Sequence, residues 1–334
     1  MTKISINGFG RIGRCAFKIA LTKENLQVVA INDLTDTRTL AYMLKYDTVY
    51  GRFGGKVSYD AKNLIVNGKK IPVFAEKDPS KLPWKKLGVD VALECTGVFD
   101  NKDALKMHLK AGAKKAILSA PAKDEVQTLV FGTELTKKIL GKNDKIISNA
   151  SCTTNCIAPV MQVLQTAFGI EKAIMTTVHA YTASQKLVDG PDAKDLRRGR
   201  AGAANLAPSS TGAAKATMLV IPELKDLFDG ISIRVPVICG SLSDITALLK
   251  KKVTVEQVNK AFEKFANQPM YKNILGIAKG DDELVSSDIV GTTESAIVDL
   301  KYTRVVGGNL VKVLAWYDNE WAYSNRLVEM ALAV

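Results

Sequence analysis

The sequence predicts an α/β protein with two domains: an N-terminal domain on a doubly wound parallel sheet and an α+β domain with a mainly antiparallel sheet. A glycine-rich turn at residues 8–13 stands between a strand-like and a helical run. Mostly apolar runs then alternate with helical stretches up to about residue 150, which is typical of a parallel sheet. Beyond residue 151 the strand-like runs are longer and alternate polar with apolar residues, as antiparallel sheets do. The 334 residues suffice for two such domains.

The first predicted unit is a strand over residues 3–7, a G-x-G-x-x-G turn and a helix over 14–23. A second strand over 27–32 ends at Asp33, and 33 − 13 places this carboxylate 20 residues after the last glycine. This arrangement is typical of a Rossmann-type dinucleotide site, in which Gly8, Gly10 and Gly13 let the backbone approach a pyrophosphate. Asp33 would accept hydrogen bonds from the ribose and repel a 2′-phosphate, so we expect NAD as the cofactor.

Three further parallel strands are predicted at 89–94, 115–118 and 145–147, with a helix over 102–110. Small or polar residues follow these strands, among them Thr96, Gly97, Ser119 and Cys152. Because ligands bind at the carboxyl ends of parallel strands, we expect these residues to converge with Asp33 on one crevice. Thr96 and Ser119 could equally serve as caps of their strands and helices, and both roles can hold together.

Cys152 is the candidate nucleophile. Ser151 and Thr153 beside it suit the start of a helix, which is predicted to continue over 157–167. At a helix N-terminus, the free N–H groups and the dipole favour the thiolate form of a cysteine. Cys156, one turn later, is interpreted as a packing residue.

A nucleophilic cysteine needs a proton acceptor, and imidazole suits this role near neutral pH. The chain has two histidines. His108 lies in a polar helical pattern and is interpreted as a surface residue, whereas His179 ends a strand predicted at 174–178, so His179 is the expected base. Whether it meets Cys152 depends on the fold, because 179 − 152 leaves 27 positions between them.

Strands at 232–237 and 245–249 and a helix opened by the capping box Thr254-Val255-Glu256-Gln257 are predicted in the second domain. A final helical run covers 324–334.

The composition is that of a soluble globular protein, with 47% hydrophobic and 24% charged residues. No apolar run approaches the ~18 residues of a membrane span, and the N-terminus enters a strand pattern instead of a signal peptide, so we expect a cytoplasmic protein without membrane contact. Five scattered cysteines do not form a disulfide framework, and with two histidines we expect no metal site.

The net charge of +12 attracts anionic partners, which could be nucleic acid, membrane surface or phosphorylated small molecules. The lysines are dispersed as doublets, so a solvated basic surface is favoured and no specific nucleic-acid partner is expected. Weak non-specific nucleic-acid binding stays open.

Four segments together resemble the glyceraldehyde-3-phosphate dehydrogenase family, and the resemblance extends over essentially the whole chain: INGFGRIGR at 6–14, SNASCTTNC at 148–156, SSTGAAK at 209–215 and WYDNEW at 316–321. The resemblance implies that Cys152 attacks the aldehyde of glyceraldehyde 3-phosphate and that His179 removes the hydroxyl proton as hydride passes to NAD. The resulting thioester would be attacked by inorganic phosphate, which releases 1,3-bisphosphoglycerate in glycolysis or gluconeogenesis.

The resemblance also implies binding roles. Thr182 and Arg234, helped by Arg197, would hold the substrate phosphate, and the attacking phosphate would be held by Ser151, Thr153, Thr211 and Gly212. The implied cofactor residues are Arg11, Ile12, Asp33, Lys77, Ser119 and Asn319. From the residues alone, Arg197 is one arginine of a charged loop, Thr211-Gly212 a helix start and Lys77 a solvated lysine.

By the same resemblance, residues 1–151 form the NAD-binding domain, 152–315 form the catalytic and tetramerisation domain, and a C-terminal helix at 316–334 packs back on the first domain. The loop at 189–208 would cross a subunit interface, so we expect a homotetramer. One departure is Ala322, where the family commonly has glycine; a positive φ there would strain the turn beside Asn319.

Two rivals remain at this point. Erythrose-4-phosphate dehydrogenase shares the cysteine chemistry but releases an acid. A surface or nucleic-acid binding protein could keep the fold without the chemistry.

Overall fold

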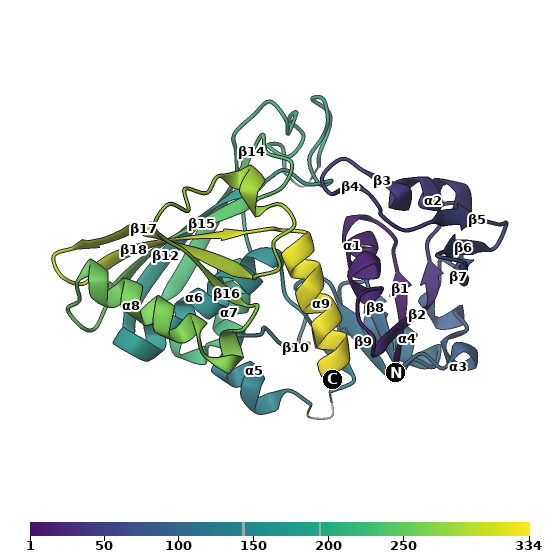
Figure 1. Cartoon of the computed structure of the whole chain (residues 1–334), viewed down its shortest axis with the longest axis horizontal. Helices are drawn as coiled ribbons and strands as arrows, with labels where there is room; N and C mark the ends of the chain where they lie inside the picture. The colour runs from purple at the N-terminus through teal and green to yellow at the C-terminus, as the bar shows by residue number, and fades with distance from the viewer. Residues whose placement is uncertain (142–143, 194) are drawn as a thin grey trace. The chain divides into compact units, whose positions relative to one another are not determined.

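The structure is a computed structural model that describes residues 1–141, 144–193 and 195–334 (Figure 1). The chain divides into two compact units. Unit 1 comprises residues 1–129, 140–150 and 324–334, and unit 2 comprises residues 130–139 and 151–323.

Unit 1 is built on a sheet that has nine strands within the described residues, in the order β10-β11-β9-β8-β1-β2-β7-β6-β5. The pairs from β10 to β7 are parallel, and β6 and β5 add an antiparallel edge. This is the predicted doubly wound sheet. Its strands are β1 (Thr2–Asn7), β2 (Leu26–Asn32), β5 (Val57–Tyr59), β6 (Asn63–Val66), β7 (Lys69–Phe74), β8 (Val91–Glu94), β9 (Lys115–Leu118), β10 (Gln127–Thr128) and β11 (Ile146–Ser148). A small separate hairpin pairs β3 (Tyr46–Asp47) with β4 (Gly51–Arg52).

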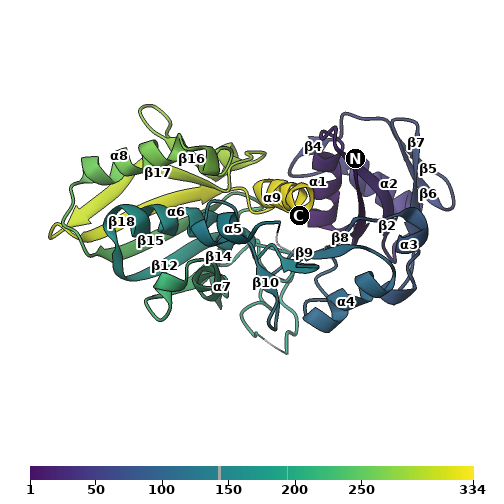
Figure 2. The ribbon, with the colours of Figure 1, turned by 90° about the horizontal axis from the view of Figure 1, so that it is seen from below.

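Helices cover both faces of this sheet, and Figure 2 shows α1 and α4 on opposite sides of its strands. The helical segments are α1 (Arg11–Ala20), α2 (Thr37–Lys45), the 3-10 turn η1 (Pro79–Lys81), α3 (Trp84–Leu87) and α4 (Lys102–Lys110). The prediction for α4 is confirmed. The first helix was predicted at 14–23 but begins at Arg11, because Gly13 belongs to its first turn. A Cβ at Gly13 would lie 2.0 Å from the Gly8 carbonyl oxygen, so only glycine lets the helix start this close to the strand.

Unit 2 is built on a sheet that has seven strands in the described part of the chain, in the order β13-β14-β12-β15-β18-β17-β16. Four of its six neighbouring pairs are antiparallel, which confirms the mainly antiparallel sheet. Its strands are β12 (Ile170–Ala180), β13 (Ala207–Ser210), β14 (Phe228–Val235), β15 (Ser241–Leu249), β16 (Leu275–Ala278), β17 (Ala296–Val306) and β18 (Leu310–Tyr317).

The helices of unit 2 include α6, which packs against the sheet and against α7 and α8. The capping box predicted at Thr254 and Gln257 is present at the start of α8. The helical segments are α5 (Glu134–Ile139), α6 (Cys152–Phe168), α7 (Ala213–Val220), η2 (Pro222–Leu224), α8 (Val255–Ala266), η3 (Pro269–Tyr271) and η4 (Ser286–Ile289).

The chain ends in α9 (Trp321–Ala333), whose residues from 324 onward belong to unit 1. Residues 316 and 317 still belong to strand β18, so the C-terminal helix is shorter than the 316–334 segment in which it was expected. Ala322 lies in the first turn of α9, and its φ is not positive. The expected strain at Ala322 is therefore absent, because alanine suits a helix.

No helix within the described ranges is both long and apolar enough to cross a membrane.

Candidate active site

Cys152 is the first residue of α6, the longest helix of unit 2. The Ser151 side chain caps the helix by accepting a hydrogen bond of 3.0 Å from the Thr154 N–H. Ala150 before it has a φ of +55°, a left-handed conformation that is costly for alanine. The turn into α6 thus stores strain just before the cysteine, a common feature of functional sites.

The structure brings Cys152 and His179 together. His179 lies near the end of β12, and its Nε2 is 3.4 Å from the Cys152 Sγ. Its Nδ1 lies 2.6 Å from the Ala180 carbonyl oxygen, which can only accept. Nδ1 also lies 2.7 Å from a guanidinium nitrogen of Arg234, which can only donate, so these distances fit either tautomer; with the proton on Nδ1, the Nε2 lone pair faces the sulfur. In this tautomer His179 can take a proton from the thiol or from a group bound to it.

Arg234 lies beside His179 in the register of β14 against β12. One guanidinium nitrogen is 2.7 Å from the His179 Nδ1 and donates to the Ala180 carbonyl oxygen at 3.2 Å. Burial, with the charge of Arg234, lowers the pKa of His179 to about 3. His179 is thus neutral at physiological pH and able to accept a proton.

Burial raises the pKa of the Cys152 thiol, although Arg234 and the Thr153 N–H at the start of α6 act in the opposite direction. The helix terminus and Arg234 favour the thiolate, as expected, while the loss of hydration on burial favours the thiol and is the larger effect. Transfer of the proton to His179 would give the thiolate.

Tyr317 is a site residue that sequence reasoning missed. Its hydroxyl lies 2.9 Å from the Thr153 Oγ1 and 2.7 Å from the Thr177 Oγ1, and its ring packs edge-on against His179 at a centroid distance of 6.0 Å. Tyr317 thereby links α6 to β12 behind the Cys152–His179 pair. The available signal was its place in the WYDNEW segment, beside Asn319.

Asn319 is held by a relay from the strand that carries His179. The Ala180 N–H donates to the Ser241 Oγ at 3.1 Å, and the Ser241 hydroxyl donates to the Asn319 Oδ1 at 2.9 Å. This fixes the side-chain carbonyl of Asn319 as an acceptor and directs its amide N–H groups elsewhere. Such an amide can orient a carboxamide like that of nicotinamide.

The residues expected to hold phosphates occupy different elements of unit 2. Thr182 follows β12 and its hydroxyl lies 2.9 Å from that of Ser184. Thr211 and Gly212 form the start of α7, where the Thr211 hydroxyl accepts from the Ala213 N–H at 3.2 Å. The two residues thus form a helix start, with Gly212 as the N-cap, and there is room for a ligand because a Cβ at Gly212 would meet nothing within 4 Å.

Arg197 lies exposed in a turn, and its neighbour Arg198 is an arginine whose charge acts on Arg234. Arg198 also donates to the Ser209 hydroxyl at 3.0 Å. The sequence-based expectation thus missed Arg198, because three arginines at 197, 198 and 200 gave no means of choosing.

Unit 1 carries a cavity of about 440 Å³ at the carboxyl ends of β1, β2 and β8. It brings together Gly8, Gly10, Asp33, Lys77 and Thr96 of the predicted cofactor residues. The other lining residues are Asn7, Asn32, Leu34, Glu76, Cys95, Val98 and Phe99. A crevice at this end of a parallel sheet is where such folds bind dinucleotides.

The glycine turn fits a dinucleotide. Gly8 has a φ of +91°, and a Cβ there would lie 2.7 Å from the backbone of Cys95 and Thr96. A Cβ at Gly10 would meet nothing within 4 Å, so glycine at this position leaves open space beside the cavity, as a pyrophosphate requires. Asp33 accepts from the Phe9 N–H at 2.7 Å, which orients its carboxylate over the turn.

The other predicted cofactor residues of unit 1 are not among the residues that line this cavity. Arg11 pairs with Asp47 at 2.9 Å, and Ile12 and Gly13 follow it in α1. Gly97 lies in the turn after β8, and the Ser119 side chain hydrogen-bonds the Cys95 thiol.

His108 is not a surface residue, contrary to the sequence-based interpretation. It is fully buried and hydrogen-bonded to Trp84 and Glu94. Charged residues surround it in the sequence because only one side of α4 faces the core, and His108 lies on that side with Leu105. Cys156 is buried, as predicted.

Comparisons with known proteins agree with the geometry. The chain matches the sequence model of the NAD binding domain of glyceraldehyde 3-phosphate dehydrogenase over residues 2–102 and that of its C-terminal domain over residues 151–319. It is 54% identical over 331 residues to the glyceraldehyde-3-phosphate dehydrogenase of Thermotoga maritima, covering 98% of each chain. The corresponding proteins of Geobacillus stearothermophilus and Clostridium pasteurianum are 51% and 49% identical, and each alignment covers 98% of this chain and 97% of the relative.

Proposed function

Because the chain belongs to the glyceraldehyde-3-phosphate dehydrogenase family, we propose that it oxidises glyceraldehyde 3-phosphate with NAD and inorganic phosphate, and that Cys152 and His179 carry the reaction. The observation that carries the proposal is the 3.4 Å separation of the Cys152 Sγ and the His179 Nε2. Erythrose-4-phosphate dehydrogenase, the nearest rival, is not favoured by these relatives.

The first step is nucleophilic attack. His179 takes the thiol proton on Nε2 and returns it to the aldehyde oxygen as the Cys152 sulfur forms a bond to the aldehyde carbon, which gives a hemithioacetal with a neutral His179. His179 next removes the proton of the new hydroxyl, so that the carbon can lose hydride and become a thioester. NAD, when bound, supplies the hydride acceptor.

The second step releases the product. An oxygen of inorganic phosphate forms a bond to the thioester carbon, the carbon–sulfur bond breaks, and the sulfur leaves as a thiolate. The product is 1,3-bisphosphoglycerate. The energy of the oxidation is retained in the acyl phosphate instead of being lost by hydrolysis.

The two phosphate groups need separate sites. For the substrate phosphate we propose Arg234 and Thr182, with an arginine of the 197–200 turn; Arg234 supports this because its guanidinium lies beside His179. For the attacking phosphate we propose the hydroxyls and N–H groups of Ser151, Thr153, Thr211 and Gly212, at the starts of α6 and α7.

The cofactor would lie across the cavity of unit 1, with its pyrophosphate over Gly10 and its adenosine ribose on Asp33. Lys77, at the exposed rim of the cavity, would add a positive charge beside the cofactor. Asn319 would orient the nicotinamide through its amide. We propose residues 1–151 as the NAD-binding domain and 152–315 as the catalytic domain.

We further propose a homotetramer in the cytoplasm. Four large apolar side chains in and beside the predicted interface loop are each at least 70% exposed in the single chain: Leu187, Val188, Leu196 and Leu206. Apolar side chains gathered on an exposed loop favour burial against another subunit.

Phosphate dependence tests the function. NADH formation from glyceraldehyde 3-phosphate should rise with added inorganic phosphate and become small without it, because the thioester then turns over only by slow hydrolysis. Steady NADH formation that does not respond to phosphate would instead indicate a dehydrogenase that releases an acid, as the rival does. Binding to nucleic acid without turnover of the aldehyde would favour the rival of another class.

A further inference from the structure

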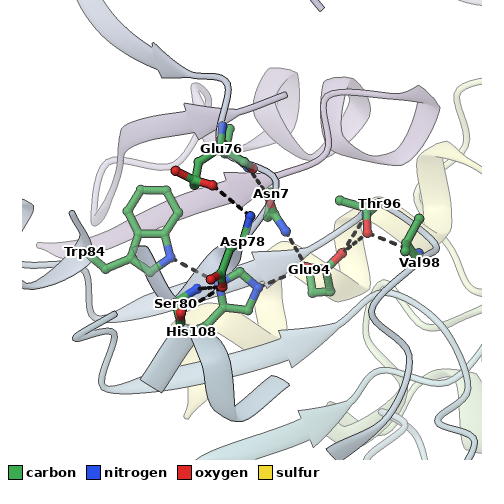
Figure 3. A network of polar contacts seen from close by, with 10 residues as sticks. Asn7, Glu76, Asp78, Ser80, Trp84, Glu94, Thr96, Val98 and His108 are labelled. Carbon is green, nitrogen blue, oxygen red and sulfur yellow. Dashed lines mark hydrogen bonds and ion pairs between the residues drawn. The ribbon is translucent and has the colours of Figure 1, made fainter. Parts of the chain in front are cut away.

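A buried carboxylate lies beneath the cofactor cavity and has no part in the proposed chemistry (Figure 3). Glu94 is the last residue of β8 and is fully buried. One of its oxygens accepts from the Asn7 side-chain amide at 2.5 Å and from the His108 ring at 2.9 Å. The other accepts from the Thr96 N–H at 2.8 Å and contacts the Thr96 hydroxyl. An ionised carboxylate suits this surrounding because it only accepts.

His108 contacts the Glu94 carboxylate on the side away from Thr96. The Trp84 indole N–H, which can only donate, points at the His108 Nδ1 at 3.1 Å. His108 Nδ1 is therefore the acceptor, and Nε2 carries the proton that goes to Glu94. Trp84 and His108 are both fully buried and belong to α3 and α4, so the carboxylate is tied to two helices.

On its other side the network reaches the walls of the cavity. The Asn7 Oδ1 accepts from the Asn32 amide at 2.7 Å, and Asn32 exchanges two hydrogen bonds of 2.9 Å with the backbone of Glu76. The Thr96 hydroxyl accepts from the Val98 N–H at 3.1 Å. Asn7, Asn32, Glu76, Thr96 and Val98 all line the cavity.

The glycine turn and the turn after β8 leave no space for an additional atom between them. A Cβ at Gly8 would lie 2.7 Å from the Thr96 nitrogen, so the turn after β8 and the glycine turn are in close contact. A shift of the Thr96 turn is therefore transmitted to the backbone that faces the cofactor.

We propose that Glu94 is the positioning residue of the cofactor cavity: held by His108, it fixes Asn7 and Thr96 and through them the walls that receive NAD. The inference rests on the proposed role of this cavity. Glu94 does not touch the cofactor in this proposal, and it acts on NAD binding alone, because Cys152 and His179 lie in unit 2.

The variant Glu94→Gln tests the inference. An amide group presents a donor on one side, and each Glu94 oxygen faces at least one N–H donor, so in either orientation the glutamine NH2 group would face at least one N–H donor. We expect the Kd and the KM for NAD to rise about tenfold, as for a lost buried hydrogen bond. The kcat at saturating NAD and the KM for glyceraldehyde 3-phosphate and phosphate should stay within about twofold.

The matched control is Asp90→Asn. Asp90 precedes the other end of β8, where its carboxylate accepts from the Lys3 N–H at 2.8 Å and pairs with Lys114. The variant removes a carboxylate just before the same strand, at the end that lies away from the cavity. NAD binding should be unchanged in this variant.

Two variants at His108 distinguish a positioning role of Glu94 from a role in stability alone. They also test the inference if Glu94→Gln does not fold. His108→Leu removes the donor to Glu94 and should weaken NAD binding, whereas His108→Gln keeps an N–H at the position of Nε2 and should restore it. Thermal melting measures the stability of each variant.

The outcomes are distinct. Unchanged NAD affinity in Glu94→Gln and His108→Leu, with a lowered melting temperature, means a structural role only and overturns the inference. Equal affinity of His108→Leu and His108→Gln also overturns it. If the native protein itself does not bind NAD, the proposed function fails, and the inference with it.

Discussion

At Cys152, burial favours the thiol, while Arg234 and the start of α6 favour the thiolate. Burial has the larger effect on the thiol, and it also lowers the pKa of the neighbouring His179 to about 3. Both shifts favour a thiol beside a neutral imidazole in the resting pair. His179 differs from a surface histidine because it stays neutral over the whole range from pH 5 to 8, in which a surface histidine titrates.

A pH profile of Cys152 alkylation checks this pair. Because a thiol is deprotonated as pH rises towards its pKa, and that pKa is raised, the rate with iodoacetamide should climb about tenfold per pH unit between pH 6 and 8. A rate that is already constant by pH 7 would contradict a raised pKa.

The variant His179→Gln tests the base. Glutamine keeps a polar group near Nε2 but cannot take a proton, so kcat should fall by about 10²–10⁴ while the Kd for NAD stays the same. Thr182→Val, three positions along the chain, serves as a control: it should raise the KM for the aldehyde more than it lowers kcat. A His179→Gln enzyme with near-native kcat would remove His179 from the mechanism.

Among the secondary-structure elements, the unit of β1, the glycine turn and α1 contains three glycines with different roles. Gly8→Ala and Gly13→Ala should both destabilise the fold, because their Cβ atoms would lie 2.7 and 2.0 Å from backbone atoms. Gly10→Ala should fold normally, since its Cβ meets no protein atom within 4 Å, and should lose NAD affinity.

Thermal melting and NAD titration measure these effects, with Gly54→Ala as the control, where a Cβ also meets nothing within 4 Å. Native NAD affinity in Gly10→Ala would show that the cofactor does not pass over this turn.

Most helices and strands could be predicted from the sequence because hydrophobic periodicity is a property of neighbouring residues. Helix α4 and strand β9 have the predicted bounds, and the α8 capping box is present. The predicted start of helix α1, at residue 14, lies after its actual start because Gly13 was interpreted as part of the turn. Its role in packing the helix on Gly8 depends on a contact that the pattern does not contain.

The polar site partners could not be predicted by local reasoning. Glu94 ends an apolar strand and His108 lies among charged residues, so neither shows its burial. Tyr317 reaches Thr153 across 164 positions, and only the pairing of β15 with β18 brings it there. The Cys152–His179 contact likewise needed the packing of α6 on the sheet.

At the scale of the whole molecule, the exposed apolar residues near the 189–208 loop predict assembly. Light scattering should give four times the chain mass of 36.2 kDa. Leu187→Lys, which puts a charge on a side chain 85% exposed in the single chain, should shift the protein to smaller species, whereas Leu21→Lys at the end of α1 should not. A native protein that is monomeric at micromolar concentration would contradict the tetramer.

The central claim is that oxidation takes place while the substrate is bonded to Cys152. Mass spectrometry of the protein mixed with glyceraldehyde 3-phosphate and NAD, without phosphate, tests it most directly. We expect a phosphoglyceroyl group on the peptide that contains Cys152, its loss on adding phosphate, and its absence from Cys152→Ser, which should still bind NAD. NADH formed by the native protein with no adduct on Cys152, or turnover retained in Cys152→Ser, would contradict the claim.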